Sequence, residues 1–167
     1  STLVPCKRGQ SHEPSEAPPK QPDTFRIFFQ NPNGIKVHDP SWVVSLGSLH
    51  DIDPDVVQLA ETNTDWNLTD ARHKLRSTTR SRLGNIGLVA SAAKDTDKHT
   101  REFRGQHYKP GGVVQILASQ WSHTVESKGE DPLGRWAWQL LSIKNKDRLL
   151  VVTGYKVCNV NPDTAGA

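Results

Sequence analysis

Cysteine is scarce in this chain of 167 residues, which contains only Cys6 and Cys158. The two lie far apart and form no C-x-x-C pair, so the sequence predicts neither a disulfide scaffold nor a zinc-binding knuckle. Long apolar runs are lacking too. None approaches the roughly 18 residues of a membrane-spanning helix, and the first residues lack the apolar segment of a signal peptide. We therefore expect an intracellular protein, nuclear location included, that has no membrane partner.

Hydrophobic residues make up only 34% of the chain, and its mean hydropathy is −0.63. This low share indicates that part of the sequence lies outside any core. Residues 1–23 are rich in Pro, Ser, Glu and Lys and show no periodicity, so we expect a disordered linker there and one domain over residues 24–167. The chain starts at Ser1 rather than at a methionine and stops soon after a predicted strand, so we expect a segment of a longer protein.

Apolar periodicity predicts mainly strands, with helices between the early ones. The strands are expected at residues 25–30, 56–60, 83–90, 111–118, 134–143 and 148–157, the helices at 41–51 and 65–80, and a polar loop or hairpin end at 91–109. This order favours an α+β fold or a layered α/β sheet. Trp136 and Trp138 lie two apart on one predicted strand and share a face, which we expect to be the core face rather than a base-stacking platform.

Basic residues are concentrated in one part of the sequence. The net charge is only +3, but residues 72–109 contain ten Lys and Arg against three Asp and Glu. A basic face of this kind favours an anionic partner, although scattered Lys and Arg are equally typical of an ordinary solvated surface.

Polar side chains follow the first two predicted strands. Asn31-Pro32-Asn33-Gly34 ends the first strand, and Glu61 ends the second. Neighbouring strands lie about 4.8 Å apart, so an Asn and a Glu at one sheet edge are within reach of one cation. Ligands that are all oxygen suit Mg²⁺ or Mn²⁺. The alternative is that Asn31 and Asn33 serve the turn and Glu61 is a surface carboxylate.

Four segments, taken in order, resemble motifs of the endonuclease/exonuclease/phosphatase superfamily. This superfamily includes the abasic-site endonucleases and the endonuclease domains of non-LTR retrotransposons. The segments are residues 25–34 with Asn-x-Asn-Gly, residues 56–63 with the strand-end Glu, residues 108–113 with the glycine pair, and residues 151–155 with the strand-end Tyr. The resemblance covers about residues 24–159 and implies a layered β-sandwich flanked by helices, of the DNase I-like type.

The resemblance also implies roles for individual residues. Glu61 is then a direct ligand of the metal, with Asn31 or Asn33 as its companion. Asn33 and Tyr155 are the catalytic candidates, with Tyr155 donating a hydrogen bond near the scissile phosphate; a half-buried tyrosine at the edge of the core is the alternative. Nucleic acid, and DNA in particular, is the expected partner, with contacts from Arg80, Arg82, Arg104 and Lys109.

Two later motifs of the superfamily have no counterpart in the sequence. They are an Asp-x-Asn that supplies the water-activating Asp and a Ser-Asp-His that supplies the phosphate-polarising His. Asp65-Trp66-Asn67 has the first spacing, but it follows the Glu strand directly. We therefore expect a truncated, divalent-metal-dependent phosphodiesterase, favoured as the endonuclease of a retroelement polyprotein. A phosphatase of the same fold and a non-catalytic nucleic-acid-binding remnant are the alternatives, and the substrate and oligomeric state stay open.

Overall fold

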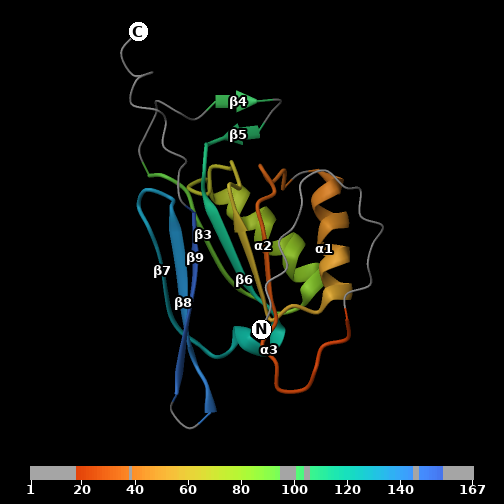
Figure 1. Ribbon diagram of the computed structural model, residues 1–167. Helices are drawn as coiled ribbons and strands as arrows, with labels where there is room; N and C mark the ends of the chain where they lie inside the picture. The colour runs from red at the N-terminus through yellow and green to blue at the C-terminus, as the bar shows by residue number, and fades with distance from the viewer. Residues whose placement is uncertain (1–17, 38, 95–100, 104–105, 145–146, 156–167) are drawn as a thin grey trace, which may run out of the picture.

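A four-stranded sheet lies at the centre of the computed structural model, which describes residues 18–37, 39–94, 101–103, 106–144 and 147–155 (Figure 1). Its strands are β1 (Ile27–Gln30), β2 (Val56–Ala60), β6 (Val113–Leu117) and β3 (Gly87–Ser91), in the spatial order β1-β2-β6-β3. β1 and β2 are parallel, whereas β6 runs antiparallel to both of its neighbours. The central strands are short apolar runs, as expected for strands that are covered on both faces.

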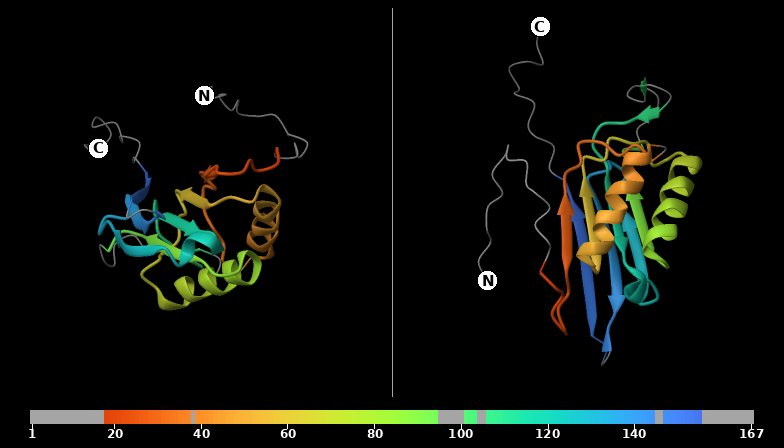
Figure 2. Two further views of the ribbon diagram at one scale, coloured as in Figure 1. Left: turned by 90° about the horizontal axis from the view of Figure 1, so that it is seen from below. Right: turned by 90° about the vertical axis from the view of Figure 1, so that its right-hand side faces the viewer.

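Two helices cover one face of this sheet, α1 (Pro40–Ile52) and α2 (Thr69–Leu83) (Figure 2). Their apolar side chains pack against those of β2 and β6 to form the largest core cluster of the described residues. Its most deeply buried members include Leu46, Leu59, Trp66, Leu75 and Ile116. The helices follow the apolar spacing of the sequence, although α2 begins at Thr69 rather than at residue 65.

The late start of α2 has a local cause. The Asp65 carboxylate accepts a hydrogen bond from the backbone N–H of Asn67 at 3.0 Å, and the Asn67 side chain also donates to it at 2.9 Å. This is an Asx turn, a local structure that competes with helix formation. Residues 65–68 therefore form a turn instead of the first turn of the helix.

A three-stranded antiparallel sheet covers the other face of the first sheet. Its strands are β7 (Val125–Glu130), β8 (Trp136–Ser142) and β9 (Arg148–Gly154), in that order. Buried amides join the two sheets: Gln115 donates to the Val151 carbonyl at 3.2 Å and to Thr153 Oγ1 at 2.9 Å, and Gln139 donates to Gln115 at 3.1 Å. The fold is thus α+β, with two facing sheets and a helical layer on one side.

The smaller elements lie at the two ends of the first sheet. A two-stranded hairpin of β4 (Arg101–Phe103) and β5 (Gln106–Tyr108) lies in the stretch that was expected to be a loop or hairpin end, and the one-turn helix α3 (Ser119–Ser122) follows β6. β7 was not predicted from the sequence, because Val125 is its only strongly apolar residue.

The expectation that Trp136 and Trp138 face the core is wrong. The alternate positions Ala137, Gln139 and Leu141 are buried against the first sheet, so both tryptophans lie on the outer face of β8. Trp136 is 39% exposed. Trp138 lies over Gly129 of the neighbouring strand, where a Cβ atom would be only 2.5 Å from Trp138 Nε1.

Part of the expected linker contacts the fold. Lys20 Nζ lies 2.6 Å from Oδ1 of the buried Asp55, and Arg26 donates to the Pro18 carbonyl at 2.9 Å. Residues 1–17 lie outside the described residues. None of the helices formed by the described residues is both long and apolar enough to span a membrane.

Candidate active site at the end of β2

Three loops meet at the edge of the first sheet where β1 and β2 end. The two strands are parallel, so residues 31–34 and 61–63 leave the sheet at the same edge. β6 starts there, because Val113 pairs with Ala60, and so the glycine pair Gly111-Gly112 arrives at this edge as well. The loops are joined by backbone hydrogen bonds from Gly34 N to Glu61 O at 2.8 Å and from Thr62 N to Gly112 O at 3.2 Å.

The backbone at this edge is strained. Asn33, Glu61 and Asn63 have φ values of 50°, 54° and 50°, a left-handed conformation that L-residues seldom adopt. Asn tolerates it, but for Glu it costs about 1 kcal/mol or more. Backbone strain of this kind tends to concentrate at functional sites and persists only where neighbours enforce it. Here the hydrogen bonds between the loops hold Glu61 in place.

Asn63 connects the three loops. Its Nδ2 donates to Asn33 Oδ1 at 3.4 Å, and its Oδ1 accepts the backbone N–H of Gly111 at 2.9 Å. Its backbone N–H donates to the Gly111 carbonyl at 2.7 Å. Asn63 was not among the site residues predicted from the sequence. The available signal was an asparagine two positions after a strand end, where a residue that accepts positive φ is favoured.

The two asparagines expected near the metal differ in their surroundings. Asn31 Oδ1 accepts the backbone N–H of Asn33 at 3.0 Å, so Asn31 does stabilise the turn. A carboxamide oxygen has two lone pairs, and one is still available for a second partner. Both side chains are exposed.

Glu61 is half-buried, and its carboxylate forms no hydrogen bond or ion pair with any residue that the structure describes. A carboxylate without a cationic partner among the described residues, on a loop joined by its backbone to the loop of Asn31 and Asn33, offers oxygen donors of the kind that a hard divalent cation needs. Mg²⁺ normally takes one or two carboxylates and keeps several waters, so this small set of donors fits it. The described residues contain no cluster of three or more His, Cys, Asp and Glu side chains.

The glycine pair Gly111-Gly112 allows a close approach of the loops. A Cβ atom at Gly112 would lie 2.8 Å from Thr62 Oγ1 and 3.1 Å from the Ser91 carbonyl. Thr62 Oγ1 in turn accepts the indole N–H of the fully buried Trp66 at 2.8 Å. Any side chain at position 112 therefore disturbs the support of the loop that carries Glu61.

Tyr155 lies at the same edge and is connected through Gly111. A Cβ atom at Gly111 would be 3.6 Å from Tyr155 Cε1. The tyrosine is half-buried and packs beside the cluster of Val89, Val113 and Ala137, and its backbone N–H donates to the Arg135 carbonyl at 2.7 Å. Its position at the rim of the core agrees with both interpretations drawn from the sequence.

No model of a known protein family matches the chain, and no curated protein matches it at significant similarity.

The expected nucleic-acid contacts do not gather around Glu61. Lys109 is near, because its backbone N–H donates to the Asn63 carbonyl at 3.3 Å, but it is only 4% exposed. Arg80 and Arg82 lie in the last turn of α2, whose end leads to Gly87 at the opposite edge of the sheet, beside Leu117. Arg104 lies outside the described residues.

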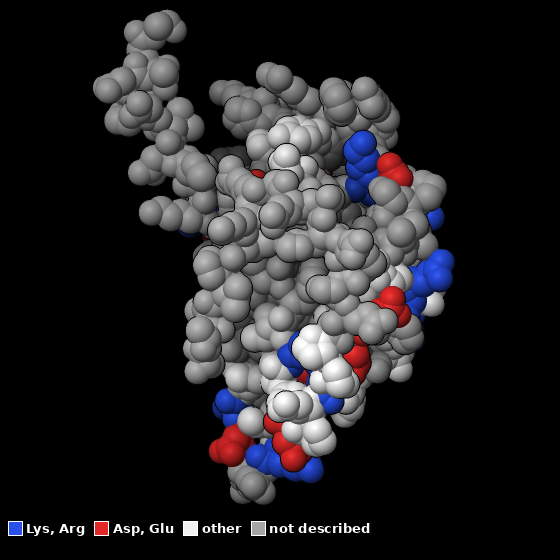
Figure 3. All heavy atoms as spheres, turned by 45° about the vertical axis from the view of Figure 1, so that its right-hand side comes forward, with Lys and Arg blue, Asp and Glu red and all other residues white. Residues whose placement is uncertain are grey.

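The surface in Figure 3 shows mixed charge. On that face, the Lys and Arg side chains that are coloured lie beside Asp and Glu side chains rather than in a patch of one sign. Among the described residues of the basic run, five lie in α2, Arg101 lies in β4, and Lys94 and Lys109 lie outside the strands.

Proposed function

We propose that the chain is part of a divalent-metal-dependent phosphodiesterase of the DNase I-like type, most of all a nucleic-acid endonuclease of a retroelement polyprotein, with DNA as its partner. The observation that carries the proposal is the strained Glu61, whose carboxylate has no partner among the described residues and whose loop is hydrogen-bonded to the loop of Asn31 and Asn33. The resemblance in sequence supports the same residues. Two facing sheets with a helical layer are compatible with the proposed fold.

In this proposal the residues of the chain bind and orient a phosphodiester. Glu61, with Asn31 or Asn33, holds Mg²⁺ or Mn²⁺, which when bound supplies positive charge against the phosphate oxygens. Asn63 keeps the Asn33 loop and the Gly111 loop in register. Tyr155 donates a hydrogen bond to the charge that develops on the phosphate, and prior placement of such a donor lowers the barrier. The sequence contains no match to the water-activating Asp or the His motif.

Metal binding is the first test, because it needs only Glu61 and the neighbouring asparagines. Mn²⁺ binding is measured by calorimetry for the wild type, for Glu61→Gln and for Asp51→Asn. Asp51 is an exposed carboxylate near the end of α1, and Asp53 and Asp55 connect that end to the start of β2, so it is a matched control far from Glu61. We expect Glu61→Gln to weaken binding at least about tenfold and Asp51→Asn to leave it unchanged. Equal losses in the two variants would rule out this site.

Cleavage is the second test. Mg²⁺-dependent nicking of supercoiled plasmid is compared for this chain and for the protein extended by the sequence encoded downstream, each with and without Glu61→Gln. Nicking by the extended protein that the substitution abolishes supports a metal-dependent nuclease. Metal binding without nicking by either form favours a phosphatase, which a phosphate-release assay detects, or a non-catalytic binding module.

A further inference from the structure

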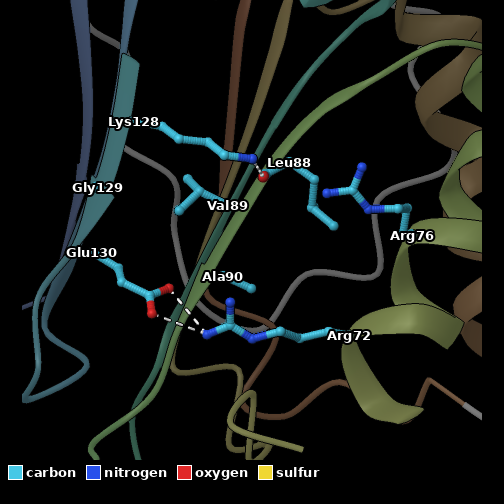
Figure 4. A pocket seen from close by; sticks show the side chains of 8 residues that line it. All are labelled: Arg72, Arg76, Leu88, Val89, Ala90, Lys128, Gly129 and Glu130. Atoms are coloured by element: carbon cyan, nitrogen blue, oxygen red, sulfur yellow. Dashed lines mark hydrogen bonds and ion pairs between the residues drawn. The ribbon is translucent and has the colours of Figure 1, made fainter. Parts of the chain in front are cut away.

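A second cluster of polar residues lies away from Glu61, in a cavity of about 260 Å³ between α2, β3 and β7 (Figure 4). β3 is at one edge of the first sheet and β7 is at one edge of the second. The cavity therefore opens where these two edges lie under the helix. Ser91 pairs with Val113, and Val113 pairs with Ala60, so β3 is two strand spacings, about 10 Å, from β2.

Positive charge predominates in this cavity. Its charged lining residues are Arg72, Arg76, Lys128 and Glu130, three cations against one carboxylate. Arg72 Nη2 lies 3.1 and 3.0 Å from the two oxygens of Glu130, and Lys94 Nζ lies 3.6 Å from one of them. The only carboxylate of the lining is therefore already shared by two cations.

The remaining cations, Arg76 and Lys128, form no ion pair with the residues that the structure describes. Lys128 Nζ donates to the Leu88 carbonyl at 3.0 Å, which leaves two of its N–H groups for other partners. Arg76 points from α2 toward Leu88 in Figure 4 and has no hydrogen bond or ion pair with the described residues. Burial, together with the neighbouring Arg76 and Arg72, lowers the pKa of Lys128, and Glu130 only partly opposes this. The cations thus repel one another in the absence of a ligand.

We propose that this cavity binds a phosphate group through Arg72, Arg76 and Lys128. Arginine presents a planar fork of donors that matches phosphate oxygens, and lysine adds a point charge. The volume is below the usual range for drug-sized ligands, so it suits a single phosphate group with little attached to it. The phosphate belongs either to a nucleic-acid backbone or to a free phosphate ester; the recognition chemistry is the same. The proposal stands on the cavity and does not depend on the proposed metal site.

The test is a titration of the whole chain with inorganic phosphate, monitored by ¹H–¹⁵N NMR. NaCl is added so that the ionic strength stays constant. Matched salt removes the general screening effect. We expect saturable shifts of the backbone amides of Leu88 and Gly129 and of the Nε–Hε signals of Arg72 and Arg76. A titration without saturable shifts at these positions overturns the proposal.

Two variants on the same helix separate a site from overall charge. Arg76→Gln removes a cation that has no partner among the described residues, and Lys74→Gln removes an exposed cation of α2 outside the cavity. We expect Arg76→Gln to weaken phosphate binding about tenfold, Lys74→Gln to change it less than twofold, and both to keep the melting temperature of the wild type. Equal weakening by the two variants overturns the proposal.

Two more titrations complete the test. A titration with an oligonucleotide identifies the source of the phosphate, and a phosphate titration of Glu61→Gln separates this site from Glu61. A short single-stranded oligonucleotide that shifts the same signals at much lower concentration than phosphate indicates a nucleic-acid backbone. Comparable concentrations for the two ligands indicate a free phosphate ester. Glu61→Gln is expected to leave the phosphate titration unchanged, because Glu61 lies two strands away. A loss of binding in this variant contradicts a separate site.

Discussion

Lys20 Nζ lies 2.6 Å from Oδ1 of Asp55, at the start of β2 and therefore at the opposite end of that strand from Glu61. Asp55 is fully buried and also accepts the indole N–H of Trp121 at 2.7 Å and the backbone N–H of Arg26 at 2.6 Å. One carboxylate thus holds together the segment before β1, the start of β2 and the helix that follows β6. Gln120 is its fourth side-chain or backbone donor.

We expect Asp55→Asn to destabilise the fold by about 3 kcal/mol, because hydrogen bonds to a buried charge are strong and its donors would be left poorly matched. Chemical unfolding followed by circular dichroism measures the change. The control is Asp53→Asn two residues earlier, where the side chain is 72% exposed. It should change stability by no more than about 0.5 kcal/mol. Similar effects of the two substitutions would contradict the structural role of Asp55.

Asp55 and Asp131 should make the fold sensitive to acid. Burial alone raises the pKa of each carboxyl group, but hydrogen bonds outweigh burial and lower the pKa below 3.8. At Asp55 the donors are Lys20 and others, and at Asp131 the main donor is Arg135. With the folded pKa lowered, the unfolded chain binds more protons in acid. The contribution of these two carboxylates to the stability of the fold is therefore fully present above about pH 5. It is lost as the pH decreases through 3.8 and below.

The measurement is the unfolding midpoint between neutral and strongly acidic pH. Asp131→Asn removes the group whose carboxylate lies 2.8 Å from Arg135 Nε. We expect this variant to be less stable than the wild type at neutral pH and to lose less of its stability in acid. If the unfolding midpoints of the two proteins decrease equally in acid, Asp131 does not contribute to the pH dependence.

The sequence predicts most of the strands but misses the edge strand β7 and the orientation of β8. β2, β6 and β9 are compact apolar runs, and both long helices follow the apolar spacing. β7 is a polar edge strand that exists because it pairs with β8, and pairing partners are not visible in one sequence. The two-residue period of β8 also left open which of its faces is buried. Gln139 is on the buried face because Gln115 offers it a partner there.

The sequence predicts which strand ends form the candidate site, but not how its loops are joined. The order of strands and turns placed Asn33 and Glu61 at two strand ends, and parallel pairing of β1 and β2 brings these ends together. Asn63 was missed, because its role depends on hydrogen bonds to two other loops. The basic run of the sequence does not reveal that Arg82 lies far from Glu61, since a helix of 15 residues carries its last turn about 20 Å from its first.

Gly112→Ala should be strongly destabilising. The added Cβ would meet Thr62 Oγ1 at 2.8 Å, and the φ of 81° is unfavourable for alanine, so we expect a loss of about 2 kcal/mol or more. Gly47→Ala in α1 is the matched control. Its Cβ meets nothing within 4 Å, and alanine there should raise stability by about 0.5 kcal/mol. Thermal unfolding of both variants measures this difference, and a tolerated alanine at position 112 would contradict the close approach of the loops.

The left-handed backbone conformation of Glu61 should lower the stability of the fold. Its φ of 54° is unfavourable for glutamate and acceptable for asparagine. We expect Glu61→Asn to raise the free energy of unfolding by about 0.5–1 kcal/mol, since the backbone strain is relieved. The same variant should lose Mn²⁺ binding, because asparagine is shorter and has no carboxylate. Glu61→Ala is the control, because alanine removes the carboxylate but keeps the strain. A gain in stability with asparagine alone, together with lost Mn²⁺ binding in both variants, would mean that the fold holds Glu61 in a strained conformation for metal binding. Equal stability of the two variants would mean instead that the left-handed conformation costs the fold nothing.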